Sequence, residues 1–240
     1  MAVALAGQLR EGTKKSHTMA ENTGFVACFL KGVVEKKSYR KLISDLYFVY
    51  EAMEEEIERL VQEEHPVIKH IGFKSLFRKE TLENDLKFYF GDNWQNEINI
   101  SKSAKEYVNR IHLVAKKSPE LLVGHHYTRY IGDLSGGQIL KKIAKKALNL
   151  DGNNGLNFYE FKNIDDEKKF KEEYSKTLNQ LPINQNIADQ IIDEANQAFT
   201  YNMKMFKELE GNLIAVLGKI VFNYLTKKVR KGVQKLNIYV

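Results

Sequence analysis

Cysteine and proline are scarce in this chain of 240 residues, which contains one cysteine and three prolines. A single thiol, Cys28, cannot form a disulfide framework or a zinc site with four cysteine ligands. A chain without disulfides suits a reducing compartment. Pro66, Pro119 and Pro182 lie between segments of helical periodicity, as expected for a residue that interrupts helix interiors.

Long apolar runs and targeting segments are also missing. The first residues contain no basic segment followed by an apolar core, so they do not resemble a secretory signal. The longest apolar run, from Leu213 to Leu225, is interrupted by Lys219. A helix needs about 20 apolar residues to cross a bilayer. We therefore expect a soluble protein with no membrane anchor.

Arginine is scarce beside lysine, with seven arginines and 30 lysines, and the net charge is +6. Proteins that read nucleic-acid bases rely on arginine for bidentate contacts, so we expect no nucleic-acid partner. A positive, lysine-rich surface suits an acidic protein or an anionic small molecule. The basic run from Lys141 to Lys146 is either a solvated face or a docking site for an acidic protein.

No convincing set of segments has the two-residue period of β-strands, whereas apolar residues recur at helical spacing. The pattern predicts an all-α protein with one domain over residues 1–226 and a flexible basic tail over 227–240. Ser38 and Ser101 are expected to cap helices, and Glu54 is expected on a solvated acidic face. The eight predicted helices span residues 3–22, 25–34, 38–62, 80–90, 101–117, 119–148, 165–180 and 184–228.

The predicted helix over 119–148 contains three glycines within six residues, Gly132, Gly136 and Gly137. Each glycine in a helix interior costs roughly 1 kcal/mol relative to alanine, so the helix is expected to be weak and kinked here. The missing side chains allow another group to pack on the bare backbone. We predict that a flat ligand lies there, with Asp133 beside it.

The segment from Leu134 to Gln138 reads LSGGQ, which is the signature peptide of ABC-type ATPases. That chemistry also requires a phosphate-binding loop, GxxxxGK followed by Ser or Thr, after a β-strand. The sequence contains neither feature, so the ATPase interpretation fails.

His17 is the first candidate metal ligand, with Glu21 one helical turn later on the same face. A carboxylate there could hold the second ring nitrogen and fix the tautomer, although a lone histidine could also be an ordinary surface residue. One histidine cannot make a four-ligand zinc site. It could hold the iron of a haem, because the porphyrin supplies four nitrogens. Arg10 and Lys14 share this helical side and could pair with an anionic ligand.

A second histidine pair, His125 and His126, is less suited to a metal. Adjacent residues on a helix point about 100° apart, so the two side chains cannot share one ion. We expect them to be ordinary packing or surface residues.

Two segments of the chain resemble a known family. Residues 11–22 read EGTKKSHTMAEN and residues 127–144 read YTRYIGDLSGGQILKKIA. With residues 89–91 and Trp94, they make the chain resemble haem oxygenase over about residues 5–213, especially the soluble form of cyanobacteria and algal plastids. The resemblance implies a single all-α fold that clamps haem between the first helix and the kinked, glycine-containing helix.

The resemblance also implies a role for each matching residue. His17 matches the axial ligand of the haem iron, and Glu21 matches its hydrogen-bonding support. Asp133 matches the distal acid that orders water near bound oxygen. The implied catalytic positions are Asp133, Gly132, Gly136, Arg129 and Tyr50. The implied haem-contacting positions are Arg10, Lys14, Tyr127, Lys171, Phe199, Asn202 and Phe206.

One position departs from the family pattern. Ser175 stands where an arginine usually follows the lysine matched by Lys171, and Lys176 is about 100° around the helix. That arginine helps to seat a haem propionate, so its replacement bears on haem affinity and on which meso carbon is cleaved.

The implied reaction opens haem b at the α-meso carbon to give biliverdin IXα, carbon monoxide and ferrous iron, with O2 as co-substrate. Haem is both substrate and cofactor. No flavin or nicotinamide motif is present, so electrons must come from outside, and we expect ferredoxin as the donor. The bilin is expected to feed pigment synthesis, with a bilin reductase as a possible downstream partner.

No presequence precedes the matching region, so we expect a location in the plastid stroma, if the chain is plastid-encoded, or in a cyanobacterial cytoplasm. Two other functions remain to be weighed. A haem storage or transport protein could use His17 without turnover, but Asp133 argues against it. A helical interaction protein would need no glycine kink.

Overall fold

The computed structural model describes the backbone of residues 3–236 and the side chains of residues 3–210. Within this range the chain is all-α, as predicted, and contains no strand. The α-helices are α1 (Leu5–Glu21), α2 (Gly24–Leu30), α3 (Lys36–Gln62), α4 (Lys79–Phe90), α5 (Lys102–Lys117), α6 (Leu122–His126), α7 (Gly132–Ala147), α8 (Glu167–Asn179) and α9 (Gln185–Leu236). The short helical turns are η1 (Ile68–His70), η2 (Lys74–Leu76), η3 (Trp94–Asn96), η4 (Pro119–Leu121), η5 (Tyr127–Ile131) and η6 (Asn157–Tyr159).

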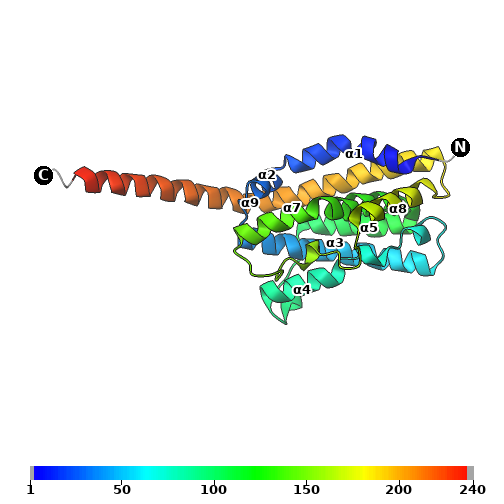
Figure 1. Ribbon diagram of the computed structural model, residues 1–240, viewed down its shortest axis with the longest axis horizontal. Coiled ribbons are helices and arrows are strands. Elements are labelled where there is room, and N and C mark those ends of the chain that lie inside the picture. The colour runs from blue at the N-terminus through cyan, green and yellow to red at the C-terminus, as the bar shows by residue number, and fades with distance from the viewer. Residues whose placement is uncertain (1–2, 237–240) are drawn as a thin grey trace.

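Helix α9 is the element against which much of the bundle packs. It contacts α1, α6, α2, α5 and α3. Figure 1 shows α1 along one edge of the bundle and α4 at the opposite edge, with α9, α7, α5 and α3 between them. The N-terminal part of α9 therefore supplies one wall for most of the other helices.

The C-terminal part of α9 extends beyond the bundle in Figure 1. The predicted tail boundary at residue 227 falls inside this helix, which continues to Leu236. Residues 237–240 lie outside the described residues, and the flexibility of the tail stays a prediction.

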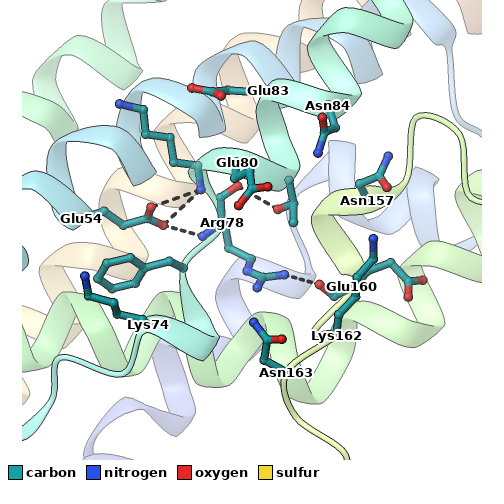
Figure 2. A pocket seen from close by; sticks show the side chains of 13 residues that line it. Glu54, Lys74, Arg78, Glu80, Glu83, Asn84, Asn157, Glu160, Lys162 and Asn163 are labelled. Carbon is teal, nitrogen blue, oxygen red and sulfur yellow. Dashed lines mark hydrogen bonds between the residues drawn. The ribbon is translucent and has the colours of Figure 1, made fainter.

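The predicted buried face of α3 is confirmed, but one polar position was wrong. The predicted apolar residues of this helix, from Leu42 to Leu60, are all at most 6% exposed. Glu54, expected on a solvated face, is only 5% exposed. Its carboxylate accepts hydrogen bonds from the backbone N–H groups of Arg78 and Lys79 and from the Tyr130 hydroxyl. Figure 2 shows these backbone contacts, by which Glu54 satisfies N–H groups at the start of α4 that have no partner within that helix.

The two predicted N-caps had different outcomes. The Ser101 hydroxyl accepts a hydrogen bond from the Ala104 N–H at 3.1 Å, as predicted. Helix α3 begins at Lys36, before Ser38, and Glu35 is its cap, accepting from the N–H groups of Lys37 and Ser38. The Ser38 prediction was wrong because the helix begins earlier, where the Glu35 carboxylate accepts from the first N–H groups, including that of Ser38 itself.

The predicted helix over 119–148 is broken just before its glycines. Residues 127–131 form η5, a single π turn, and α7 starts at Gly132. An inserted π turn rotates the residues on either side of it and is common at functional sites. The break therefore sets the direction in which the first turn of α7 presents its side chains.

Burial of Glu54 makes the stability of the fold depend on pH. Burial raises the pKa of this carboxyl from 4.5 to about 7. Between these values the folded state binds more protons than the unfolded state, so stability falls as pH rises through this window and levels off above it. A shift of this size corresponds to roughly 3 kcal/mol.

We expect Glu54→Gln to make this fall smaller, because the amide oxygen still accepts the backbone hydrogen bonds but does not titrate, while other buried carboxyls such as Asp85 still contribute. Urea unfolding from pH 4.5 to 7.5 measures it, and the exposed neighbour variant Glu55→Gln should keep the slope of the unmodified protein. Equal slopes for Glu54→Gln and the unmodified protein would show that Glu54 does not cause the effect.

Candidate active site

His17 lies on α1 with its ring partly open to solvent, the side chain being 58% exposed. Its Nδ1 is 3.7 Å from the Glu21 carboxylate. Its ring and the Phe199 ring of α9 form a T-shaped pair, with 5.9 Å between the ring centroids. Glu21 therefore faces Nδ1 and orients the ring. The Nε2 atom is left as the nitrogen that can bind a metal.

The first turns of α7 present bare backbone. A Cβ atom added to Gly132 or Gly136 would have no atom within 4 Å apart from its own helix, whereas one added to Gly137 would meet Tyr159 at 3.3 Å. Gly132 and Gly136 are one turn apart and share a face of the helix. This face borders open space, as the prediction of a ligand on bare backbone requires.

Asp133 belongs to a hydrogen-bond network that joins four helical segments. The Tyr50 hydroxyl of α3 donates to its carboxylate, and the Arg129 guanidinium of η5 lies 3.4 Å from both carboxylate oxygens. Arg129 also donates to the Tyr50 oxygen at 3.1 Å and to the Asn202 amide oxygen of α9 at 3.0 Å. The sequence predicted all four as site residues, and the structure brings them together.

Burial controls the charge states in this network. It raises the pKa of Asp133 well above its ordinary value and lowers the pKa of Arg129. The positive charge of Arg129 favours the ionised carboxylate and so opposes part of the shift of Asp133. An acid with a raised pKa beside hydrogen-bond donors is suited to holding and passing a proton.

Helix α9 connects the His17 side of the site to the Asp133 side. Phe199 touches His17, Asn202 binds Arg129, and Phe206 stacks on Phe25 of α2. These three α9 residues are spaced by three and four positions, so they lie on one helical face. That face therefore runs from His17 to the Asp133 network.

One hollow lies beside His17 and another beside Asp133, and the two differ in character. The hollow beside His17 has a volume of about 440 Å³ and includes Arg10, Lys14, Tyr127 and Glu11, so it combines an imidazole with two cationic groups and one carboxylate. The hollow beside Asp133 has a volume of about 80 Å³ and is mainly apolar. Its other lining residues are Phe25, Val26, Phe29, Leu42, Leu46, Arg129, Leu140, Phe158, Tyr159 and Phe206.

The sequence did not predict that α2 and residues 158–159 supply apolar lining for the hollow beside Asp133. The compact run Phe25, Val26 and Phe29 has the spacing of a buried helical face, but this pattern is the same for an ordinary core helix. Only the packing of α2 against α7 shows that these α2 residues line the hollow beside Asp133.

Lys171 lies on α8, which packs against α1. Ser175, one turn later, donates its hydroxyl hydrogen bond to the Lys171 backbone carbonyl at 2.8 Å. The serine hydroxyl is thus bound to its own helix, and it does not replace the reach of an arginine.

A larger hollow of about 570 Å³, shown in Figure 2, lies on another side of the bundle. Its central cation, Arg78, is 4% exposed and donates to the backbone carbonyls of Leu76 and Glu160. The guanidinium carbon of Arg78 lies over the Phe161 ring, 3.9 Å from the ring centroid. These contacts fix the start of α4 to the loop after η6, so Arg78 has a structural role.

No group of three or more His, Cys, Asp or Glu side chains in the described part of the chain could hold a metal ion. Within the same residues, no helix is long and apolar enough to cross a membrane. A single histidine can hold a metal whose other ligands belong to a flat organic ring. A helical protein with one such histidine, open glycine backbone and a buried acid has the features of a site for a planar metal complex.

Comparison with known proteins agrees with this class. The family model described as "Heme oxygenase" matches residues 3–208. The chain is 61% identical, over 97% of its length and 95% of the relative's, to heme oxygenase 1 of Synechocystis sp.. It is 51% identical to heme oxygenase of Porphyra purpurea, over 97% of this chain and 98% of that protein.

The fold comparison gives the same result. The crystal structure of heme oxygenase-1 from the cyanobacterium Synechocystis sp. in complex with heme superposes with a TM-score of 0.89 and 62% identity, covering 93% of this chain and 100% of that chain. The chain belongs to the haem oxygenase family. It is an oxidoreductase that opens the haem ring to biliverdin.

Proposed function

We propose that the chain opens haem b at the α-meso carbon, giving biliverdin IXα, carbon monoxide and ferrous iron, with His17 as the axial ligand of the iron. The observation that carries the proposal is the open, side-chain-free face of Gly132 and Gly136 next to the Asp133 network. The residues present fit haem, because a flat ring can lie on bare backbone while His17 Nε2 faces its iron. Haem bound in this way supplies the iron that activates O2.

The cationic hollow beside His17 seats the propionate groups in this proposal. Arg10 and Lys14 share one side of α1, and Tyr127 lies in the same hollow. Burial raises the pKa of Tyr127, although a hydrogen bond with Thr13 and the positive charge of Arg10 oppose part of the rise. The phenol therefore keeps its proton and can donate a hydrogen bond to a carboxylate. Lys171 adds a further cation from α8, whereas Ser175 leaves one propionate without the arginine that is usual in the family.

Asp133 has the role of positioning water and supplying a proton at the oxygen substrate. The bonds from Tyr50 and Arg129 fix its carboxyl group, and burial raises its pKa, as suits a group that holds and passes a proton. Gly132 and Gly136 leave no side chain between α7 and the ring. The helix can therefore approach the ring closely and restrict the oxygen substrate to one meso edge.

Changing Asp133 to Ala should lower the rate of biliverdin formation by about 100-fold, since one general acid typically contributes this much or more. Haem should still bind, with a Soret band like that of the unmodified protein. The assay is addition of haemin, then reductant and oxygen, followed by bilin absorbance. Asp133→Asn should keep the contacts with Tyr50 and Arg129 but not the proton, and should also be slow. Undiminished bilin formation in Asp133→Ala would refute the role.

The electron donor in this proposal is ferredoxin. Ferredoxin is an acidic protein and this chain has a net charge of +6, so the charges of the two proteins are complementary. Within the basic run, Lys141 is paired with Glu160. Lys142, Lys145 and Lys146 are exposed on the outer face of α7 and are the candidates for docking. The proposed location is the plastid stroma or a cyanobacterial cytoplasm, with the bilin passed to a bilin reductase for pigment synthesis.

If docking is electrostatic, the KM for reduced ferredoxin should rise several-fold when salt increases from about 0.02 to 0.2 M, since salt screens exposed charges. Steady-state turnover at several salt concentrations measures this. A double variant, Lys142→Glu with Lys146→Glu, should raise KM at low salt and weaken its salt dependence. A KM independent of ionic strength in the unmodified protein would contradict the docking proposal.

A further inference from the structure

A row of buried rings leads from Asp133 away from the proposed haem space. Tyr50, which donates to Asp133, has its ring centroid 5.4 Å from that of Tyr130. The Tyr130 ring is 4.6 Å from the His126 ring, and His126 is 5.5 Å from Tyr174 on α8. All four rings are at most 2% exposed. The row therefore crosses the bundle from α3 to α8 without contact with solvent.

The last two members of the row form a hydrogen-bonded pair. The Tyr174 hydroxyl lies 2.8 Å from Nδ1 of His126, and the two rings are nearly parallel, at 9°. Burial lowers the pKa of His126 to about 3, so the imidazole is neutral at physiological pH. A neutral imidazole whose Nδ1 accepts the Tyr174 bond carries its proton on Nε2. That nitrogen has no hydrogen-bond partner among the described residues, although the nearby Ile71 backbone favours protonation of the ring.

A second buried tyrosine faces a histidine elsewhere in the bundle, but its surroundings differ. The Tyr107 hydroxyl is 3.4 Å from Nδ1 of His125, beyond the usual range of a strong hydrogen bond. The Nε2 of His125 lies 2.8 Å from the Glu194 carboxylate, which also binds Arg110. This second pair ties helices together through ionic contacts. The Tyr174–His126 pair has no ionic partner, and its histidine continues the row to Tyr130.

We propose that Tyr174 and His126 form a proton-coupled redox site that takes up an oxidising equivalent escaping from the haem. This inference rests on the proposed haem-binding function. Such an oxidising equivalent is produced when a peroxide reacts at the haem. The peroxide then takes the place of O2 and the externally supplied electrons. The row of rings gives it a path of short steps into the bundle, away from the substrate.

The step balances in electrons and protons. Tyr174 loses one electron, which passes through His126, Tyr130 and Tyr50 to the peroxide-derived oxidant at the haem, and that oxidant is reduced by one electron. The phenol O–H bond breaks, and its proton forms an N–H bond at Nδ1 of His126. The products are a neutral tyrosyl radical and an imidazolium.

The proton moves toward His126 even though the imidazole is a weak base there. A phenol that has lost an electron is a far stronger acid than an imidazolium, so the hydrogen bond already in place carries the proton across. When the external donor returns one electron, the proton goes back to Tyr174. Tyr130, whose hydroxyl lies 3.2 Å from the Glu54 carboxylate, has its own proton acceptor for the intermediate step.

The test uses the haem-loaded protein without reductant, mixed with hydrogen peroxide, frozen within milliseconds and examined by electron paramagnetic resonance. A tyrosyl signal is expected, and Tyr174→Phe should lower its yield several-fold while keeping the packed ring. His126→Gln, which lacks the imidazole base, should also lower the yield or change the hyperfine pattern. The matched control Tyr107→Phe removes a buried hydroxyl that also faces a histidine, and it should leave the signal unchanged.

A second experiment separates this inference from haem binding. The haem-free protein is oxidised by photogenerated tris(bipyridine)ruthenium(III), and the tyrosyl yields of the unmodified protein and Tyr174→Phe are compared. A lower yield in Tyr174→Phe supports the pair whether or not haem binds. If haemin gave no Soret band, the proposed function would fail and this comparison would still stand. Equal tyrosyl yields with and without Tyr174 in the haem-free experiment, or in protein that shows a Soret band, would overturn the redox site.

Discussion

The buried guanidinium of Arg129 is the interaction on which the rest of the site depends. A charge removed from water is tolerated only when it is paired and its hydrogen bonds are made. Arg129 meets this condition through Asp133, Tyr50 and Asn202, which come from α7, α3 and α9. Removing any of these partners leaves a buried charge partly unpaired. The same contacts that stabilise Arg129 therefore hold Asp133, the proposed catalytic acid, in place.

The backbone around Arg129 explains how one short segment meets several requirements. The π turn of η5 directs Arg129 into the bundle, and the next turn begins with Gly132 and Asp133. Glycines there weaken the helix by roughly 1 kcal/mol each relative to alanine. The contacts of Arg129 with Tyr50, Asn202 and Asp133 hold this segment from its inner side. On the open side, the proposed haem would complete the packing in place of a side chain.

The fold and the site differed in how far the sequence could predict them. The all-α class and the eight helical segments follow from periodicity, because burial of one helical face imposes that pattern. The burial of Glu54 was not predicted, because an acidic residue in an acidic run has the pattern of a solvent-exposed residue. Its burial depends on contact with the start of α4, which is distant in the sequence. The π turn was not predicted, since no residue in 127–131 is incompatible with an ordinary α-helix.

The roles proposed for the site residues came from resemblance, and the geometry adds physical reasons for them. Spacing could place His17 beside Glu21, but it could not bring Tyr50 to Asp133, which are 83 residues apart. The aromatic row through His126 was also hidden, because a pair of adjacent histidines predicts only that they do not share a metal. Contacts between distant segments are set by the packing of α3, α6 and α8, which a one-dimensional pattern does not contain.

The central claim is that the bare face of Gly136 is open because haem lies on it. The most direct measurement is a haemin titration of Gly136→Leu, followed by the Soret band, together with urea unfolding of the haem-free protein. Leucine is a better helix former than glycine, and its Cβ would meet no atom within 4 Å outside its own helix, so the account predicts unchanged or higher stability. It also predicts haem affinity weakened by at least about tenfold, or 1.4 kcal/mol. Full haem affinity in a normally folded Gly136→Leu variant would contradict the account.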